Sequence, residues 1–129
     1  MVLTSDGLEA DSLLRTYTTF SAILASTNDE VTNTGYSRIT LTDAGLAAYT
    51  VDTANHTITL PLANQTFTTI LAGDDWRKLI VGYDSDTTTG TDANIVPICH
   101  LDLLIDGVAV IPNGNNIILS FPNGLLIAR

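Results

Sequence analysis

The C-terminal third of the chain, residues 95–128, constrains the fold more than any other stretch. It contains four apolar runs of strand length that are rich in Ile, Val and Leu. Asp106-Gly107, Asn113-Gly114 and Asn123-Gly124 separate these runs, and such dipeptides tolerate the positive φ angles of tight hairpin turns. Because short apolar runs joined by hairpin turns are typical of antiparallel sheets, this region predicts an all-β fold.

Residues 95–105 alternate in a way that predicts a strand with two different faces, since successive side chains of a strand point to opposite sides. Ile98 and Leu104 lie on a mixed face that we expect to meet solvent or a partner surface. Pro97 has no N–H to donate, so the start of this strand is predicted to lie at a sheet edge. The opposite face is predicted to pack in a core and consists of Ile95, Pro97, Cys99, Leu101, Leu103 and Ile105.

The N-terminal segment carries the best helix signal in the chain. Asp6 and Glu9 occupy the positions of a capping box. An apolar stripe at helical spacing follows, formed by Ala10, Leu13, Leu14 and Tyr17. The pattern predicts one short helix, which either closes one end of a sandwich or forms an arm that docks on a neighbouring subunit. We divide the chain accordingly into an N-terminal arm and short helix, residues 1–18, and a β-sandwich domain, residues 19–129.

Several strand-length segments precede or follow polar turns in the rest of the chain. Trp76 stands at the head of one of them and is predicted to be a core or interface anchor. Near the C-terminus, Ile117, Leu119 and Phe121 share the predicted inward face of another. The segments before the C-terminal third are residues 19–26, 36–41, 46–51, 56–60 and 76–84. Together these signals predict an antiparallel, jelly-roll-like β-sandwich with one short N-terminal helix.

The composition excludes several classes of function. The formal net charge is −9, and only two of the five basic residues, Arg77 and Lys78, are adjacent. Nucleic acid binding requires clustered basic residues, so we expect no nucleic acid partner. No apolar run approaches the roughly 20 residues that span a bilayer, and the chain starts without the features of a signal peptide, so we expect no membrane association. The single cysteine, Cys99, permits no internal disulfide.

The acidic residues and the two histidines form no convincing chemical site. Asp84, Asp86 and Asp92 lie in an oxygen-rich loop, but the spacing does not match a calcium-binding EF-hand loop, in which an acid would replace Ile95. We therefore expect a solvated loop, although calcium remains the alternative. His56 is expected to be a packing or surface residue.

Nucleophilic catalysis also lacks a complete set of residues. Cys99 and His100 are neighbours on a strand and point to opposite faces, so they cannot pair locally. His100 and Asp102 share a face, but no serine in a nucleophile-elbow context accompanies them. Asp74 and Asp75 are adjacent in a turn and are expected to diverge. We expect no catalytic residue, no cofactor and no metal, and hence a protein that is not an enzyme.

The order of several segments resembles a family of small phage virion proteins over residues 8–128. In that family a short N-terminal helix precedes the first strand, here FSAILAST, and a Gly-Tyr-Arg start is followed by an Asp-Trp strand and a closing FPxGxLxI segment. The matching residues are Gly35, Tyr36, Arg38, Asp75, Trp76, Gly82, Tyr83, Asp84, Phe121, Pro122, Gly124, Leu125 and Ile127. Members of this family are described as head decoration, minor structural or tail-associated proteins with jelly-roll-like sandwiches that form oligomers.

The resemblance implies a capsid decoration, or cement, protein that binds the major capsid protein on the outside of the head after synthesis in the host cytoplasm. A homo-oligomer, in the form of a trimer, is expected, and the apolar content of 45% favours subunit interfaces. A tail-fibre module that binds a host receptor or glycan is the alternative. We expect the removal of residues 1–14 to abolish attachment but not folding. The predicted partner contacts are Leu3, Leu8, Leu13, Leu14, Ile98 and Leu104.

Overall fold

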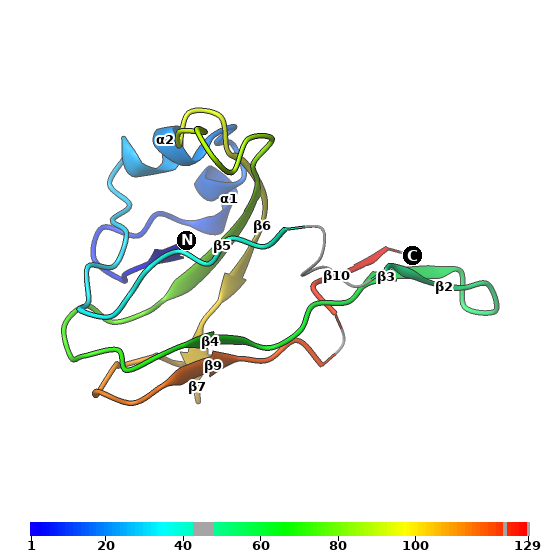
Figure 1. Cartoon of the computed structure of the whole chain (residues 1–129). Coiled ribbons are helices and arrows are strands. Elements are labelled where there is room, and N and C mark those ends of the chain that lie inside the picture. Colours follow the sequence, from blue (N-terminus) through cyan, green and yellow to red (C-terminus); the bar gives the residue numbers. More distant parts are fainter. Residues whose placement is uncertain (43–47, 123, 129) are drawn as a thin grey trace.

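The structure is a computed structural model that describes residues 1–42, 48–122 and 124–128 of the 129-residue chain. Within these residues strands predominate, and the helices α1 (Asp11–Leu14) and α2 (Phe20–Leu24) are short (Figure 1). This architecture confirms the predicted small all-β fold. The strands are β1 (Val2–Leu3), β2 (Thr50–Asp52), β3 (Thr57–Leu60), β4 (Gln65–Phe67), β5 (Lys78–Tyr83), β6 (Val96–Asp102), β7 (Leu104–Ile105), β8 (Val108–Ala109), β9 (Ile117–Leu119) and β10 (Leu126–Ala128).

An antiparallel sheet in the order β1–β5–β6 forms the centre of the molecule. Val2 pairs with Leu79 and Leu3 pairs with Lys78, so the N-terminal residues are part of this sheet. β6 pairs along the other side of β5 over its whole length. In the described part of the chain β6 is thus an outer strand, which confirms the edge position predicted from its proline.

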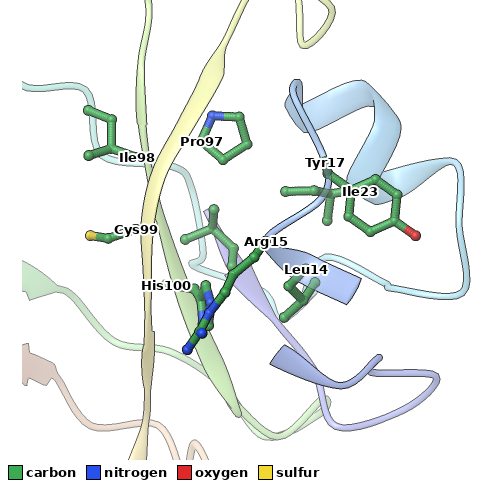
Figure 2. Close-up of a pocket in the computed structure, with 9 residues that line it drawn as sticks. Leu14, Arg15, Tyr17, Ile23, Pro97, Ile98, Cys99 and His100 are labelled. Atoms are coloured by element: carbon green, nitrogen blue, oxygen red, sulfur yellow. The ribbon is translucent and has the colours of Figure 1, made fainter. Parts of the chain in front are cut away.

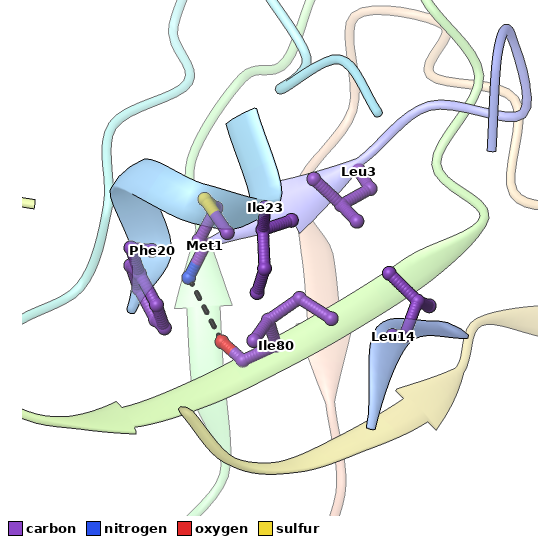
Figure 3. Packing of buried hydrophobic residues seen from close by; sticks show 6 residues of the cluster. All are labelled: Met1, Leu3, Leu14, Phe20, Ile23 and Ile80. Atoms are coloured by element: carbon purple, nitrogen blue, oxygen red, sulfur yellow. Dashed lines mark hydrogen bonds between the residues drawn. The ribbon is translucent and has the colours of Figure 1, made fainter. Parts of the chain in front are cut away.

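Each face of the central sheet is covered by a different hydrophobic cluster. Val2 and Leu3 are neighbours on one strand, so they point to opposite faces and reach different clusters. The cluster on the side of the two helices consists of Met1, Leu3, Leu14, Phe20, Ile23 and Ile80 (Figure 3). The cluster on the other side consists of Val2, Val31, Phe67, Ile70, Trp76 and Leu79, and the small sheet β4–β9 adds Ile117 and Leu119 to it. The body of the protein is therefore layered as helices, central sheet and second sheet.

Trp76 is the centre of the second cluster. Its side chain is fully buried, and its ring meets the ring of Phe67 edge to face at a centroid distance of 4.8 Å. Tyr36 approaches the same indole at 5.6 Å, also edge to face. This geometry suits the quadrupoles of aromatic rings and adds to the burial of apolar area. Trp76 is thus a core anchor, as the sequence predicts.

A three-stranded sheet in the order β10–β3–β2 lies outside both clusters. Figure 1 shows these strands projecting away from the layered body at the right of the view. We refer to β2, β3 and β10 as the arm. The hairpin β7–β8 is a separate two-stranded unit that follows β6.

The predicted helix over residues 6–17 is wrong in its start and length. α1 covers only Asp11–Leu14, and its N-cap Ala10 makes no side-chain capping hydrogen bond. The cause lies at Gly7, where φ is +66° and where a Cβ atom would lie 2.0 Å from the carbonyl oxygen of Thr27. The chain turns at this glycine instead of continuing as a helix.

Residues 19–26 contain the helix α2 where the sequence predicts a strand. Thr19 is extended, and its Oγ1 accepts a hydrogen bond from the N–H of Ala22 at 3.1 Å, which caps the helix. Phe20 and Ile23, one turn apart, both pack in the cluster on the helix side. The cap and this apolar pair outweigh the strand propensity of the segment. The described chain therefore has two short helices rather than one.

The other predicted strands have mixed outcomes. The strand predicted at residues 36–41 is wrong, because this segment pairs with no other strand. The turn at residues 42–45 and the start of the strand at 46–51 fall largely on residues 43–47, which lie outside the described residues. The strands predicted at residues 56–60 and 76–84 are confirmed as β3 and β5.

A bulge interrupts the pairing of β5 with β6. Val81 pairs with Cys99, but Gly82 pairs with Pro97. Ile98 is therefore the additional residue on β6, and its side chain is 52% exposed. The additional residue shifts the alternation of side chains by one position, so odd-numbered residues before the bulge and odd-numbered residues after it point to opposite faces of the sheet.

The prediction that alternate residues of 95–105 share one core face is wrong, and the bulge is the cause. Ile95 packs on the helix side, whereas Leu101 and Leu103 pack on the side of Trp76. Ile105 belongs to the hairpin β7–β8 and is 64% exposed, so it does not lie in a core.

The predicted hairpin turn after β7 is confirmed. Asp106 and Gly107 have φ angles of +52° and +81°, which is the combination that type I′ turns require. Gly114 and Gly124 also have positive φ, at +92° and +78°, but the hairpins predicted there are wrong, because β9 pairs with β4 and β10 pairs with β3. Asn123, the first residue of the last predicted turn, lies outside the described residues.

Candidate functional site

A shallow pocket of about 120 Å³ lies between α1 and β6 (Figure 2). Leu14, Ile23 and Ile80 supply apolar lining, and Arg15 and His100 supply polar atoms. Sites for small organic ligands usually enclose roughly 300–1,000 Å³. The pocket is therefore too small to bury a ligand of ordinary size.

A buried lysine ties α1 to the central sheet beside this pocket. Lys78 is 3% exposed, and its ammonium group donates hydrogen bonds to the carboxylates of Asp11 and Asp102, the latter at 2.8 Å. Burial acts to lower the pKa of Lys78, but these bonds more than offset it, so the pKa lies above its ordinary value. The hydrogen bond from Lys78 lowers the pKa of Asp11. The buried charge is thus paired, and the arrangement is a structural ion pair.

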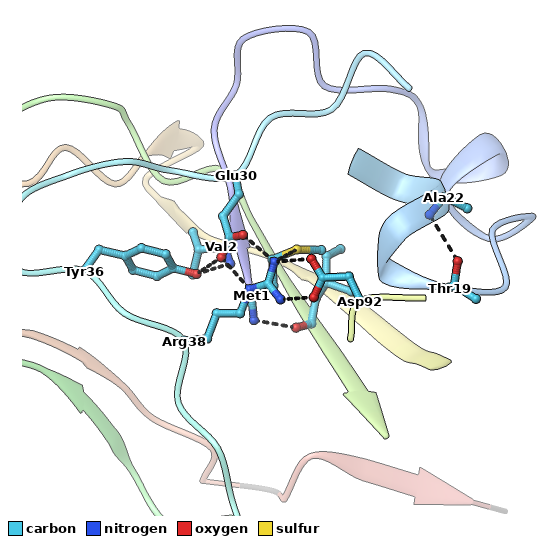
Figure 4. A network of polar contacts seen from close by, with 9 residues as sticks. Met1, Val2, Thr19, Ala22, Glu30, Tyr36, Arg38 and Asp92 are labelled. Carbon is cyan, nitrogen blue, oxygen red and sulfur yellow. Dashed lines mark hydrogen bonds and ion pairs between the residues drawn. The ribbon is translucent and has the colours of Figure 1, made fainter. Parts of the chain in front are cut away.

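Arg38 connects two loops near the N-terminus (Figure 4). Its guanidinium donates to Glu30 through Nε at 2.8 Å and also donates to both carboxylate oxygens of Asp92. The hydrogen bonds to Glu30 and Asp92 raise the pKa of Arg38, while the bond from Arg38 lowers the pKa of Asp92. Tyr36 donates to Glu30 at 2.8 Å and accepts from the N–H of Val2 at 3.0 Å. Tyr36 and Arg38, two residues of the family resemblance, therefore fix the loops around β1.

The carboxylates of the loop at residues 84–92 have different partners. Asp84 accepts from the N–H of Asp86, Asp86 accepts from the hydroxyls of Thr88 and Thr89, and Asp92 binds Arg38. Among the described residues no group of three or more metal-ligating side chains comes together. The geometry gives the loop internal hydrogen bonds rather than a shared cation position.

Cys99 and His100 have unrelated surroundings. Burial raises the pKa of the Cys99 thiol, which disfavours the thiolate that nucleophilic chemistry needs. The Nδ1 atom of His100 lies 3.7 Å from Asp11, whereas Asp102 binds Lys78. His100 and Asp102 therefore do not form the pair that would orient a catalytic base.

The two adjacent acids at positions 74 and 75 diverge, as the sequence predicts. Asp74 accepts hydrogen bonds from the backbone and hydroxyl of Thr32. Asp75 accepts instead from the hydroxyls of Thr4 and Ser5. Each carboxylate fixes a different loop, so the pair does not form a two-carboxylate site.

The predicted partner contacts at the N-terminus require correction. Leu3 is fully buried and Leu14 is 3% exposed, because both pack in the cluster between the helices and the sheet. Leu8 is half-buried against that cluster, and only Leu13, at 49%, is well exposed. Residues 1–18 are thus part of the folded body and do not form the free N-terminal extension that the sequence predicts. Removal of residues 1–14 would delete β1 (Val2–Leu3) and also the core side chains of Met1 and Leu14, so the truncated chain is not expected to fold.

The other two predicted contacts, Ile98 and Leu104, are exposed, and they belong to a run of exposed apolar residues along one edge of the fold. It follows β6, an outer strand of its sheet, and continues onto the hairpin β7–β8. We define this β6 edge surface by five residues whose side chains are 39–64% exposed: Val96, Ile98, Leu104, Ile105 and Val108. Exposed apolar side chains on the outer strand of a sheet are typical of sites of protein association.

A second exposed apolar surface lies on the arm, and sequence analysis missed it. Tyr49, Val51 and Ile58 are 67%, 56% and 49% exposed. The signal was present as alternation of apolar and polar residues at 49–52 and 57–60. Alternation predicts which residues share a face, but it does not tell whether the apolar face is covered.

Comparison of the chain with protein-family models, with curated proteins and with solved structures finds no match. Within the described residues, the helices are too short to cross a lipid bilayer.

Proposed function

We propose that the chain is a non-enzymatic structural protein of a bacteriophage virion, namely a decoration protein that binds the major capsid protein on the outside of the head. In this proposal the central sheet and the β4–β9 sheet belong to a jelly-roll-like sandwich. The family resemblance supports the proposal, since Tyr36, Arg38 and Trp76 have clear structural roles in the fold.

One observation carries the proposal: exposed apolar side chains follow the outer strand β6 and continue onto the hairpin β7–β8. A decoration protein must leave binding surface uncovered when it folds. The chain has a net charge of −9, so it would be repelled by an acidic capsid surface. Contact through uncharged side chains avoids this repulsion and depends little on salt.

Binding to purified heads tests the proposal. Heads that lack the protein, from the phage that encodes it, are mixed with the purified chain and sedimented. We expect the chain to sediment with the heads between about 0.1 and 0.5 M salt, and the heads to withstand a higher temperature when the chain is bound. Ile98→Asp should abolish the binding, because it places a charge in the contact.

Ile118→Asp is the matched control, because Ile118 is 58% exposed but lies on β9, outside the β6 edge surface. Loss of binding in Ile98→Asp alone supports the proposed surface. Equal binding of the two variants contradicts it. Failure of the unchanged chain to bind heads, combined with binding to tails, favours the tail-fibre alternative.

A further inference from the structure

The arm is an antiparallel sheet with two faces of different chemistry. Val51 pairs with Ile58, and Thr50 pairs with Thr59 one residue away. Because side chains alternate along each strand, Val51, Ile58 and Leu60 lie on one face together with Tyr49, which precedes β2. The opposite face carries polar residues, namely Thr50, Asp52, Thr57 and Thr59. We name the first set the arm face.

The arm face is not covered by the body of the protein. Tyr49, Val51 and Ile58 are each about half exposed or more, and the arm contributes no residue to either hydrophobic cluster. Sheets with one apolar face are stable when that face packs against a second layer. The layer is missing from the described part of a single chain.

The total surface of the chain shows how much area is available. A compact monomer of 13.7 kDa exposes about 6,600 Å². The chain exposes 7819 Å², an excess of about 1,200 Å² over that expectation. A stable protein–protein interface takes about 800 Å² from each partner. The excess is therefore large enough for one complete interface, and Figure 1 shows the arm as the part that departs from a compact outline.

We propose that a second copy of this chain covers the arm face, with the two arms packed face to face about a two-fold axis. Each arm then supplies the second layer that the other lacks, and the pair forms a small two-layer sandwich with its sheets about 10 Å apart. A two-fold interface uses the same surface on both copies, which is the commonest symmetry of soluble oligomers.

Charge favours this location for self-association. Two copies with a net charge of −9 each repel one another, so their contact requires a surface without acids. The arm face meets this condition, because the one acid of β2, Asp52, lies on the opposite face. The inference does not depend on the proposed function, since it concerns the purified chain alone.

Analytical ultracentrifugation of the full chain tests the inference. We expect a species of twice the 13.7 kDa chain mass. Val51→Asp should weaken the dimer by about 100-fold or more, because two charges are then buried in one interface. Thr50→Asp is the matched control, since the neighbouring residue is exposed on the polar face, and it should leave the dimer intact. A monomer, an assembly other than a dimer, or a dimer that Val51→Asp does not weaken overturns the inference.

Crosslinking provides a second test that does not require a disruptive change. In a Cys99→Ser background, Val51→Cys should form a covalent dimer with a thiol crosslinker that spans about 10 Å, the distance between packed sheets. Thr50→Cys should not, because its side chain points away from the partner arm. Equal crosslinking at the two positions contradicts the face-to-face arrangement.

Discussion

The indole Nε1 of Trp76 donates a hydrogen bond to the Oδ1 of Asn33 at 2.9 Å, and both side chains are buried. The amide nitrogen of Asn33 in turn donates to the carbonyl oxygens of Leu71 and Asp74, at 3.1 Å and 3.0 Å. A single asparagine therefore satisfies the polar atom of the core tryptophan and holds the loop before β5. Trp76→Phe should lower the free energy of unfolding by about 2–4 kcal/mol, because it removes buried atoms and leaves the Asn33 oxygen without its donor.

Urea denaturation measures this loss. Tyr83→Phe is the control, since Tyr83 is also aromatic and ends β5 but is 61% exposed, and its effect should stay within about 0.5 kcal/mol. A Trp76→Phe variant as stable as the Tyr83→Phe variant would show that the hydrogen bond and the core position are unimportant.

Gly82→Ala should destabilise the fold by about 1–3 kcal/mol through overpacking. A Cβ atom at this position would lie 2.6 Å from ring carbons of Phe20 and 2.7 Å from Ile95, so α2 could no longer sit on the sheet. Gly107→Asn is the comparison, because a Cβ atom there meets nothing within 4 Å and asparagine tolerates positive φ. Thermal unfolding that ranks Gly107→Asn below Gly82→Ala in stability would contradict this packing.

Removal of the Lys78 ammonium group and removal of its two carboxylate partners should change the free energy of unfolding by different amounts. Asp11 and Asp102 are about half exposed, so Lys78→Met leaves two hydrated carboxylates and should change stability by less than about 1 kcal/mol. The double change Asp11→Asn and Asp102→Asn leaves a buried ammonium group unpaired and should cost about 3–5 kcal/mol. Chemical denaturation at neutral pH distinguishes these outcomes, and equal losses would show that Lys78 is not held in a buried environment.

The contact between Arg38 and Asp92 predicts a specific loss of stability in acid. Since the folded-state pKa of Asp92 lies below its ordinary value, its contribution is present above about pH 4 and is lost as the pH falls through the lowered pKa. Arg38→Met should therefore make stability fall less steeply below about pH 4. Arg77→Met, which removes a more exposed pair at 3.4 Å, should leave the slope unchanged. Urea midpoints measured from neutral to acidic pH test this, and an unchanged slope in Arg38→Met would contradict it.

The features that could be predicted from the sequence depend on local chemistry. The turn at Asp106 and Gly107 follows from the φ angles that this dipeptide allows. Ile117, Leu119 and Phe121 all pack toward the Trp76 cluster, as their spacing predicts. In each case neighbouring residues determine the outcome, and no contact distant in the chain opposes it.

The features that could not be predicted depend on contacts between distant segments. α2 forms where the propensity favours a strand, because Phe20 and Ile23 pack on a sheet that is built much later in the chain. The bulge at Ile98 arises in the pairing of β5 with β6 and leaves no pattern within β6 itself.

The candidate site shows the same limit. The side chains of Leu3 and Ile98 are both aliphatic, yet the first is fully buried and the second is half exposed. Pairing of β1 with β5 decides this difference, and the sequence near Leu3 gives no sign of that pairing. The sequence therefore predicts the exposure of Ile98 and Leu104, but it also predicts partner contacts for Leu3 and Leu14, which lie in the core.

Imaging of intact phage particles tests the central claim most directly. Particles are treated with an antibody against the chain and examined by electron microscopy, with particles that lack the protein as the control. Our account predicts regularly spaced label over the surface of the head and none on the tail. Label confined to the tail, or a particle that carries no label, would contradict the assignment as a head decoration protein.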